Sequence, residues 1–350
     1  NVWTYMSADE EAGIVYLPIS TPTNDYWGGF RLGENLFAES IVALDIETGE
    51  RIWHFQTVHH GVWDYDVASA PNLVDIEVDG KAIKAIAQVS KTAFTYVFDR
   101  ITGEPVWPIE ERPVAQSDIP GERLHPTQPF PTKPAPFDRQ GISEDDLIDF
   151  TPEIAEAARE MAKEYVLGPI FTPPIVRGSN GKRSTFVVPG AGGGANFPGA
   201  TVDPETGIIY IPSATLPHGM GLVAPPDGTS DWPYIIQMDT KIGPFGLPLL
   251  KPPYRRITAI DLNTGEHVWQ IPFGRGPANH PMLEHLNLPP LGSVFSDVVA
   301  EGGVLITKTL LISYLAQKDE IDPEAHGSIL VAHDKMTGDL LGEVLVDQRL

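Results

Sequence analysis

The chain has 350 residues, of which 42% are hydrophobic and only 20% are charged, a composition typical of globular proteins and too apolar for disorder. The formal net charge of −23 is spread along the sequence, which argues against nucleic acid or an anionic membrane surface as a partner. The absence of cysteine excludes disulfides and thiol catalysis, and there is no run of about 18 apolar residues that would predict a membrane span.

The sequence begins at Asn1 in the middle of a pattern, without an initiator methionine or a signal peptide. We therefore expect it to be a segment of a longer protein. Residues 9–18 read as the first hairpin, with a turn around Gly13 and a β-rich strand that ends at Pro18. Residues 203–212 repeat this phrase. The many prolines (34) and glycines (33) favour short strands joined by turns.

A second phrase occurs four times along the chain and indicates a repeat architecture. Each copy is a β-rich run that meets Asp-x-x-Thr-Gly and then a second strand, and the first three copies close on tryptophan. The copies are residues 41–53, 97–107, 259–269 and 331–341. Asp can cap the turn, glycine supplies the positive φ, and the tryptophan can pack against the next repeat. The pattern predicts an all-β fold, a β-propeller of four-stranded blades with about four to five blades here, and the alternative is a β-sandwich.

Residues 56–66 follow a predicted strand and concentrate aromatic, imidazole and carboxylate side chains in one loop. A carboxylate beside Trp63 is partly desolvated, which suits Asp64 to accept a proton. Asp66 is an alternative base, and a surface turn with solvated acids is the alternative without function. Adjacent residues in a strand-like run point to opposite faces, so we expect His59 and His60 to shape a substrate pocket or the surroundings of Asp64 instead of binding one metal together.

Two long stretches interrupt the repeat. An insert at about residues 110–174 begins with a proline-rich segment, 113–136, which we expect to be an extended covering loop. A helix follows, with Thr151 as N-cap and Pro152 at its first position, running to about Tyr165. Residues 216–253 are also rich in glycine and proline and read as irregular. Loops of this length over the mouth of a propeller are expected to roof a site.

These features resemble the pyrroloquinoline-quinone (PQQ)-dependent dehydrogenases, in particular the membrane glucose and quinate/shikimate dehydrogenase branch. The resemblance keeps the family order from residue 1 to about 345, so we expect residues 1–350 to form one partial propeller domain. The matching pieces are Asn1-Val2-Trp3, Thr21-Pro22, Asp25-Tyr26-Trp27-Gly28-Gly29, Gln56-Thr57-Val58-His59-His60, Trp63-Asp64, Lys91, Pro126-Thr127-Gln128-Pro129-Phe130, Phe171-Thr172-Pro173-Pro174 and Gly243-Pro244-Phe245-Gly246-Leu247-Pro248.

The resemblance implies an eight-bladed propeller that holds the quinone cofactor and a Ca²⁺ ion near its axis. Trp3 resembles the residue that forms the floor under the cofactor, because a planar quinone gains from stacking on an aromatic face, and packing between blades is its alternative role. Asp64 matches the catalytic base. Lys91 resembles the basic residue that contacts the quinone oxygens, where a cation stabilises negative charge.

Three positions extend or depart from the family pattern. Asn196, in the glycine-rich stretch 191–197, resembles a cofactor contact, and its alternative is a glycine-rich turn. Thr21 stands near the position where relatives supply an asparagine ligand to Ca²⁺, so we expect a threonine oxygen to contact the metal. Gly61 stands where glucose-type members often carry aspartate, so the sequence leaves the substrate open.

By resemblance, the protein is a PQQ-dependent dehydrogenase that oxidises a sugar, polyol or cyclic alcohol and passes electrons to ubiquinone or a cytochrome. The resemblance also implies a periplasmic location, with an anchor in the inner membrane supplied by upstream sequence. A propeller that serves as a protein-binding scaffold, without catalysis, is the alternative because fold alone does not imply function.

Overall fold

The computed structural model describes residues 1–294, 303–316 and 327–347. Four sheets follow the repeat along these residues, and their strands run antiparallel in chain order. The first blade consists of β1 (Ser7–Asp9), β2 (Ile14–Pro18), β3 (Ser40–Asp45) and β4 (Arg51–Gln56). The second consists of β5 (Asn72–Val78), β6 (Lys81–Val89) and β7 (Thr95–Asp99). The third consists of β13 (Thr201–Val202), β14 (Ile208–Ala214), β17 (Arg255–Asp261) and β18 (Glu266–Pro272). The fourth consists of β19 (Val304–Ile306), β20 (Leu310–Ala316), β21 (Ser328–Asp334) and β22 (Leu340–Val346).

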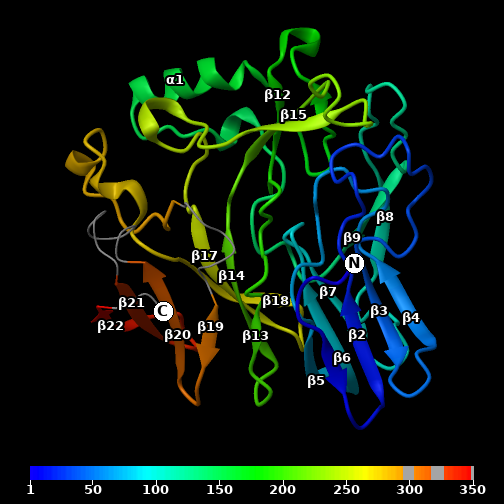
Figure 1. Cartoon of the computed structure of the whole chain (residues 1–350). Helices are drawn as coiled ribbons and strands as arrows, with labels where there is room; N and C mark the ends of the chain where they lie inside the picture. The colour runs from blue at the N-terminus through cyan, green and yellow to red at the C-terminus, as the bar shows by residue number, and fades with distance from the viewer. Residues whose placement is uncertain (295–302, 317–326, 348–350) are drawn as a thin grey trace.

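The blades stand side by side, and the strand that opens each blade contacts the corresponding strand of the next, in the order β1, β5, β13 and β19 (Figure 1). Buried apolar side chains fill each space between two neighbouring blades. This arrangement confirms the predicted all-β propeller, present as a partial set of blades. In the second blade, Pro105 forms a single bridge to Phe98 where a fourth strand was expected, because proline lacks the N–H that a strand ladder needs.

The Asp-x-x-Thr-Gly phrase forms the predicted turn in all four blades. In the first blade, Asp45 Oδ1 accepts hydrogen bonds from the amides of Glu47 and Thr48, at 3.0 and 2.8 Å. The glycine that closes each phrase has a φ between 72° and 78°. The closing tryptophan then packs on the glycine of the next phrase, as Trp53 does on Gly103 and Trp269 on Gly338. The inter-blade role of these tryptophans is therefore confirmed.

Alanine at Gly103 is expected to destabilise the protein more than alanine at Gly49. Both glycines have left-handed backbone, with φ of 76° and 72°, so both substitutions carry a strain of about 1–2 kcal/mol. A Cβ on Gly103 would lie 2.6 Å from Cγ of Trp53, whereas a Cβ on Gly49 would meet nothing within 4 Å. The overpacking adds about 1–3 kcal/mol at Gly103 only. Urea unfolding of the intact protein measures both losses, and equal losses would contradict the tryptophan contact.

Elements outside the blades lie above them (Figure 1). They are the hairpin β8 (Ile109–Pro113) and β9 (Thr127–Pro131), the helix α1 (Pro152–Ala162), and a sheet of β10 (Tyr165–Val166), β12 (Ser184–Val187), β15 (His218–Val223), β11 (Ile175–Val176) and β16 (Ile235–Asp239). Thr151 caps α1 as predicted, because its hydroxyl accepts from the amide of Ile154 at 3.3 Å. The helix ends at Ala162 instead of Tyr165, because Tyr165 starts β10 and pairs with Ser184.

Two stretches predicted to be irregular contain strands. Residues 113–136 hold β9, and residues 216–253 hold β15 and β16. The prediction missed β15 because its sequence, His-Gly-Met-Gly-Leu-Val, places glycines at every second position. Met220 and Leu222 are buried on one face, while a Cβ on Gly219 would lie 2.7 Å from the Ser184 hydroxyl on the other. The run therefore alternates apolar residues with glycines, which is a strand pattern. The glycines occupy the face that another chain segment approaches closely.

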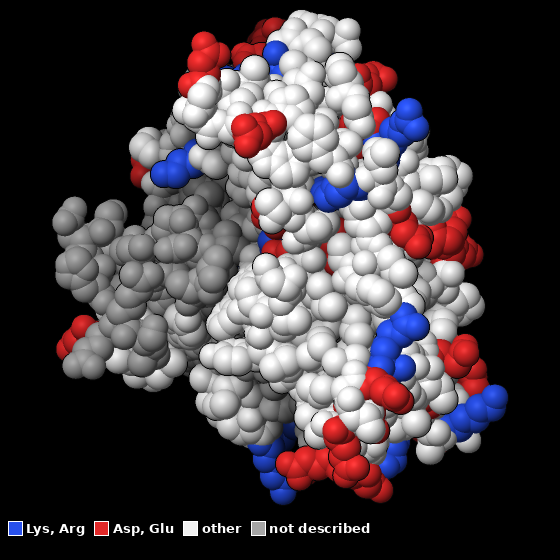
Figure 2. Space-filling model, turned by 45° about the vertical axis from the view of Figure 1, so that its right-hand side comes forward, with Lys and Arg blue, Asp and Glu red and all other residues white. Residues whose placement is uncertain are grey.

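Charged side chains are dispersed over the face drawn in Figure 2, which shows no extended basic patch. This distribution agrees with the spread of acidic residues along the sequence. Among the described residues, no helix has the length and apolar character needed to cross a bilayer.

Candidate active site

The segment between β4 and β5, residues 57–71, is largely buried in the protein interior. Val58, Val62, Trp63 and Tyr65 are buried in a cluster beneath the elements above the blades. The Trp63 indole N–H donates to the carbonyl of Thr172 at 2.9 Å. The alternative of an exposed turn with solvated acids is therefore wrong.

Asp64 sits in this segment with left-handed backbone, at φ 60°, and its carboxylate is 22% exposed. The Tyr26 hydroxyl donates to Oδ2 at 3.1 Å, and the Lys91 ammonium donates to Oδ1 at 3.2 Å. Burial raises the pKa of Asp64 to about 7, against the opposing charge of Lys91 and with a further rise from Asp66. A carboxylate with a pKa near neutrality is suited to general base catalysis.

Lys91 and Asp66 form the buried part of the same ion-pair network. The Lys91 ammonium lies 2.7 Å from Oδ2 of Asp66, and only 5% of the lysine side chain is exposed. Oδ1 of Asp66 accepts from the amide of Thr21 at 2.7 Å. Both oxygens of Asp66 are thus occupied, so the geometry favours Asp64 over Asp66 as the base. The ammonium has three protons and donates to two carboxylates, which leaves one for another acceptor.

Glu39 is a site residue that the sequence did not reveal. It is fully buried at the entry to β3, and its Oε1 accepts from the Thr21 hydroxyl at 3.0 Å. Its Oε2 is buried without a hydrogen-bond partner. Burial raises the pKa of Glu39 to about 8, opposed by the charge of Arg31. The sequence could not predict this role of Glu39, because Thr21 and Asp66 are distant in sequence and come close to it only in the folded protein.

The glycine-rich stretch lies against Lys91. The amide of Gly194 donates to the carbonyl of Lys91 at 2.9 Å, and a Cβ on Gly193 would lie 2.5 Å from the lysine side chain. Asn196 holds its own loop, because Nδ2 donates to the Gly192 carbonyl at 2.9 Å and Oδ1 accepts from the Phe197 amide at 2.7 Å. This is the turn role considered from the sequence, and it leaves one amide proton of Asn196 for a ligand.

Trp3 is connected to this loop through Phe197. The two rings stack with centroids 6.1 Å apart and planes at 14°, and the Trp3 side of the pair is 44% exposed. Among the described residues, the Trp3 indole is therefore not packed between two blades, which was its alternative role. The loop 192–197 therefore touches both Trp3 and Lys91, and Lys91 contacts Asp64.

His59 and His60 have different hydrogen-bonding partners, and they lie in a bend where a strand-like run was expected. His60 is buried with φ 46°, and its Nδ1 lies 2.6 Å from the Gly33 carbonyl oxygen and its Nε2 2.7 Å from Oε1 of Glu122. Glu122 also accepts from the amide of Gly28 at 2.6 Å. His60 thereby supports the loop that carries Tyr26. His59 pairs with Glu111 at 3.0 Å instead.

Alanine at His60 is expected to cost about 3–5 kcal/mol of unfolding free energy, because it leaves the buried Glu122 carboxylate without its side-chain partner. Both ring nitrogens of this buried side chain lie within hydrogen-bond distance of an oxygen, the Gly33 carbonyl oxygen and Oε1 of Glu122, and alanine removes both contacts. Thermal and urea unfolding measure the loss, with exposed His285→Ala as the control. A double variant, H60A with E122Q, is expected to recover part of the loss. Equal destabilisation in the single and double variants would contradict the buried pair.

His218 is a second residue that sequence reasoning missed. Its Nδ1 accepts from the amide of Ala191 at 3.0 Å, so the neutral ring carries its proton on Nε2. Burial lowers the pKa of His218, and the charge of Lys91 lowers it further. The neutral imidazole is therefore a donor close to Lys91. In the sequence, the one feature that could have indicated His218 is its position at the start of residues 218–223, where glycines alternate with other residues.

A family model described as "PQQ: Glucose/ethanol/alcohol dehydrogenase, beta-propeller domain" matches residues 1–349. The chain belongs to this family. The family of PQQ-dependent dehydrogenases implies pyrroloquinoline quinone as the cofactor, as the sequence resemblance predicted. Quinoprotein glucose dehydrogenase of Escherichia coli (strain K12) is 33% identical over 90% of this chain. Quinate/shikimate dehydrogenase (quinone) of Acinetobacter baylyi is 30% identical over 91% of it.

The chain spans 42% and 41% of the lengths of these two relatives. Among solved structures, quinohemoprotein alcohol dehydrogenase from Comamonas testosteroni aligns with a TM-score of 0.60 and 20% identity, over 100% of this chain and 41% of that one. A europium-containing methanol dehydrogenase aligns with a TM-score of 0.58 and 20% identity, over 100% of this chain and 46% of that one. These alignments show the fold that this chain shares with them.

The residues of this chain fit a planar quinone and a divalent cation. Four carboxyl groups, those of Asp25, Glu39, Asp64 and Asp66, lie close enough to influence one another, and within the described part of the chain the cations that act on them are Lys91 and Arg31. A divalent ion would balance this excess of negative charge, and the unpartnered Oε2 of Glu39 would gain a partner. The half-exposed Trp3 ring and the third proton of Lys91 suit a flat, oxygen-bearing ring system.

Proposed function

We propose that the protein oxidises a hydroxyl group of a sugar, polyol or cyclic alcohol with PQQ as the immediate electron acceptor. The observation that carries the proposal is the Asp64 carboxylate, whose pKa is about 7 and which is held by Tyr26 and Lys91. Membership in the PQQ-dependent dehydrogenase family supports it. The names of the relatives, glucose, quinate/shikimate and glycerol dehydrogenases, support the substrate classes.

In this proposal the chain's residues position the substrate hydroxyl and take its proton. PQQ, when bound, would supply the acceptor for the hydride that leaves the alcohol carbon as the carbonyl forms. Asp64 is the base that removes the hydroxyl proton, and Tyr26 and Lys91 fix its two oxygens. The remaining proton of Lys91 would donate to a quinone oxygen and stabilise negative charge there. Trp3 would support one face of the ring, and Asn196 would donate its free amide proton.

We assign the metal to the acidic end of the network, with Ca²⁺ as the ion. Glu39, the Thr21 hydroxyl and Asp66 supply oxygen atoms, which Ca²⁺ prefers. Thr21 would have to release the hydrogen bond that its hydroxyl now donates to Glu39, so that its oxygen faces the ion. Such an ion would also favour the ionised form of Asp64 and thereby assist the base.

Glu39 also bears on the substrate. A Cβ on Gly61 would lie 2.0 Å from Oε1 of Glu39, so the Glu39 carboxylate fills the space that a side chain at residue 61 would need. Glucose-type members often carry aspartate at this position. In this chain a carboxylate is therefore supplied at the same place by Glu39, the residue before β3, and its Oε1 accepts from the Thr21 hydroxyl. This difference favours a substrate other than glucose within the proposed classes.

The electron acceptor in the proposal is ubiquinone or a cytochrome, and the location is the periplasm, with membrane association through parts outside this chain. The relative named as a quinone-linked dehydrogenase supports the first of these acceptors.

The test is dye reduction by the intact protein reconstituted with PQQ and Ca²⁺, over a panel of aldoses, alditols and cyclic alcohols. We expect turnover on at least one class of substrate. A PQQ titration followed by tryptophan fluorescence separates this function from a scaffold, because a scaffold would show no quenching. Absence of both turnover and quenching would contradict the proposal.

A further inference from the structure

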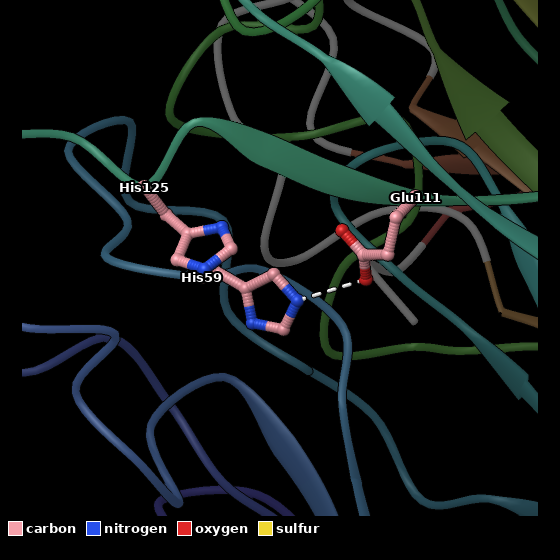
Figure 3. Close-up of side chains that lie close together, drawn as sticks. All are labelled: His59, Glu111 and His125. Carbon is pink, nitrogen blue, oxygen red and sulfur yellow. Dashed lines mark hydrogen bonds and ion pairs between the residues drawn. The ribbon is translucent and has the colours of Figure 1, made fainter.

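Three side chains outside the candidate active site form a cluster with the composition of a metal site. His59 belongs to the segment between β4 and β5, Glu111 to β8, and His125 to the loop just before β9. One ligand atom from each residue can be chosen so that all three lie within 4.8 Å of one another. Figure 3 shows the two imidazole rings side by side, with the Glu111 carboxylate next to His59.

The contact between His59 and Glu111 already has the spacing of two ligands on one ion. Nε2 of His59 lies 3.0 Å from Oε1 of Glu111. Zinc bonds of about 2.0–2.1 Å at tetrahedral or wider angles place neighbouring ligand atoms about 3.3 Å apart or slightly more. Replacement of the shared proton by an ion therefore needs only a small outward movement. The ring centroids of His59 and His125 are 4.6 Å apart, so the second imidazole is also close enough to bind the same ion.

Each of the three residues is oriented by a further hydrogen bond to β9. The Thr127 hydroxyl donates to Oε2 of Glu111 at 2.6 Å, and Nδ1 of His125 donates to the Thr127 carbonyl at 2.8 Å. The backbone of His59 is held on both sides by the Gln128 side chain, which accepts from its amide at 2.8 Å and donates to its carbonyl at 2.6 Å. Such outer contacts are what fix metal ligands in place.

One polar atom in the cluster lacks a partner. Nδ1 of His59 is buried and makes no hydrogen bond, while Nε2 faces Glu111. An ion bound at Nδ1 would give that atom the partner that it lacks, whereas an ion bound at Nε2 would leave Nδ1 a buried N–H donor without an acceptor. The ion pair of His59 and Glu111 alone explains neither the position of His125 nor this buried nitrogen.

We propose that His59, Glu111 and His125 bind a divalent transition-metal ion of the Zn²⁺ class, with water in the remaining position. Two imidazoles and one carboxylate favour zinc-like ions over Ca²⁺, which prefers oxygen ligands throughout. Glu111 is half-exposed, so solvent reaches the site. The ion would join the segment that carries Asp64 to the hairpin of β8 and β9, so its role is to fix the position of that segment. The inference does not depend on the proposed dehydrogenase reaction.

The experiment uses Co²⁺ as a visible probe on the intact protein, with PQQ and excess Ca²⁺ present so that the proposed cofactor site is filled. We expect one equivalent of Co²⁺ to give a d–d absorption band, and its affinity to fall at least 10-fold in His125→Gln and in Glu111→Gln. His285→Gln, an exposed histidine on a different segment, is the matched control and is expected to bind like the parent protein. Zn²⁺ should displace Co²⁺ and abolish the band.

Thermal unfolding gives a second reading that does not depend on the spectrum. Zn²⁺ is expected to raise the unfolding temperature of the parent and of the His285 variant but not of the two site variants, whose circular dichroism verifies folding. No Co²⁺ binding, or binding that is the same in the site variants and the control, would overturn the proposal.

Discussion

Replacement of Asp64 by asparagine is expected to reduce kcat by about 10²–10⁴-fold, the range that a positioned general base contributes. Asparagine keeps the size of the side chain and its one oxygen can still accept from Lys91, but its NH2 group replaces the oxygen that accepts from Tyr26, and the amide cannot take the hydroxyl proton. Cofactor affinity should therefore change little. Asp79→Asn, at an exposed turn with φ 52°, is the matched control and is expected to leave kcat unchanged. An active Asp64→Asn enzyme would remove Asp64 from its role.

The pH dependence of the reaction follows from the same carboxylate. Burial raises the pKa of Asp64 to about 7, and only the ionised form accepts a proton. The rate should therefore rise with pH, with a midpoint at about pH 7 when no Ca²⁺ is bound. A Ca²⁺ ion near Asp64 would lower its pKa and move this midpoint to lower pH. The profile of kcat/KM, measured at saturating Ca²⁺ and at several lower concentrations, checks this. A midpoint that does not move with Ca²⁺ would place the ion away from Asp64.

Replacement of Glu39 by glutamine is expected to weaken Ca²⁺ binding by about 10-fold or more, because ligand charge count sets Ca²⁺ affinity. Glutamine has nearly the same shape and still accepts from the Thr21 hydroxyl, so the surrounding fold should persist. Isothermal titration of the metal-free protein with Ca²⁺ measures the change. Glu10→Gln, an exposed glutamate of the first hairpin, is the control and should have no effect. Unchanged Ca²⁺ affinity in Glu39→Gln would contradict the assignment.

Glu39 also predicts how stability depends on pH without Ca²⁺. Its pKa is about 8 in the folded protein and 4.5 in an unfolded chain, so the folded state holds the proton more tightly. This contribution to stability is complete below about pH 4.5 and is lost as the pH rises to 8 and above. The slope of unfolding free energy against pH should be shallower in Glu39→Gln, and excess Ca²⁺ should restore stability at pH 8.5. Parallel slopes for the variant and the parent protein would contradict a buried, protonated Glu39.

The blades could be predicted from the sequence because the decisive contacts are local. Asp45 and Gly49 form one turn within five residues, and Trp53 reaches a turn of the same kind one repeat later. Asp64 could be selected because Trp63, its neighbour in sequence, indicated burial. Lys91 and Trp3 could be proposed only through the family resemblance.

The remaining site residues depend on contacts between distant segments, which no pattern in one sequence reports. Glu39 acquires its environment from Thr21 and Arg31, and His60 from Glu122, which is 62 residues away. His59 pairs with Glu111 on β8, and the partner strand β9 lies in the segment 113–136 that was expected to be an extended covering loop. The fold brings these groups together only after the elements above the blades have formed.

The most direct test of the proposed active site is a crystal structure of the intact protein with PQQ and Ca²⁺ bound. We predict that the quinone ring lies on the Trp3 indole, with its oxygens next to Lys91 and with the Asp64 carboxylate facing the same cavity. A quinone bound elsewhere, with Trp3 and Asp64 opening onto separate surfaces, would contradict it.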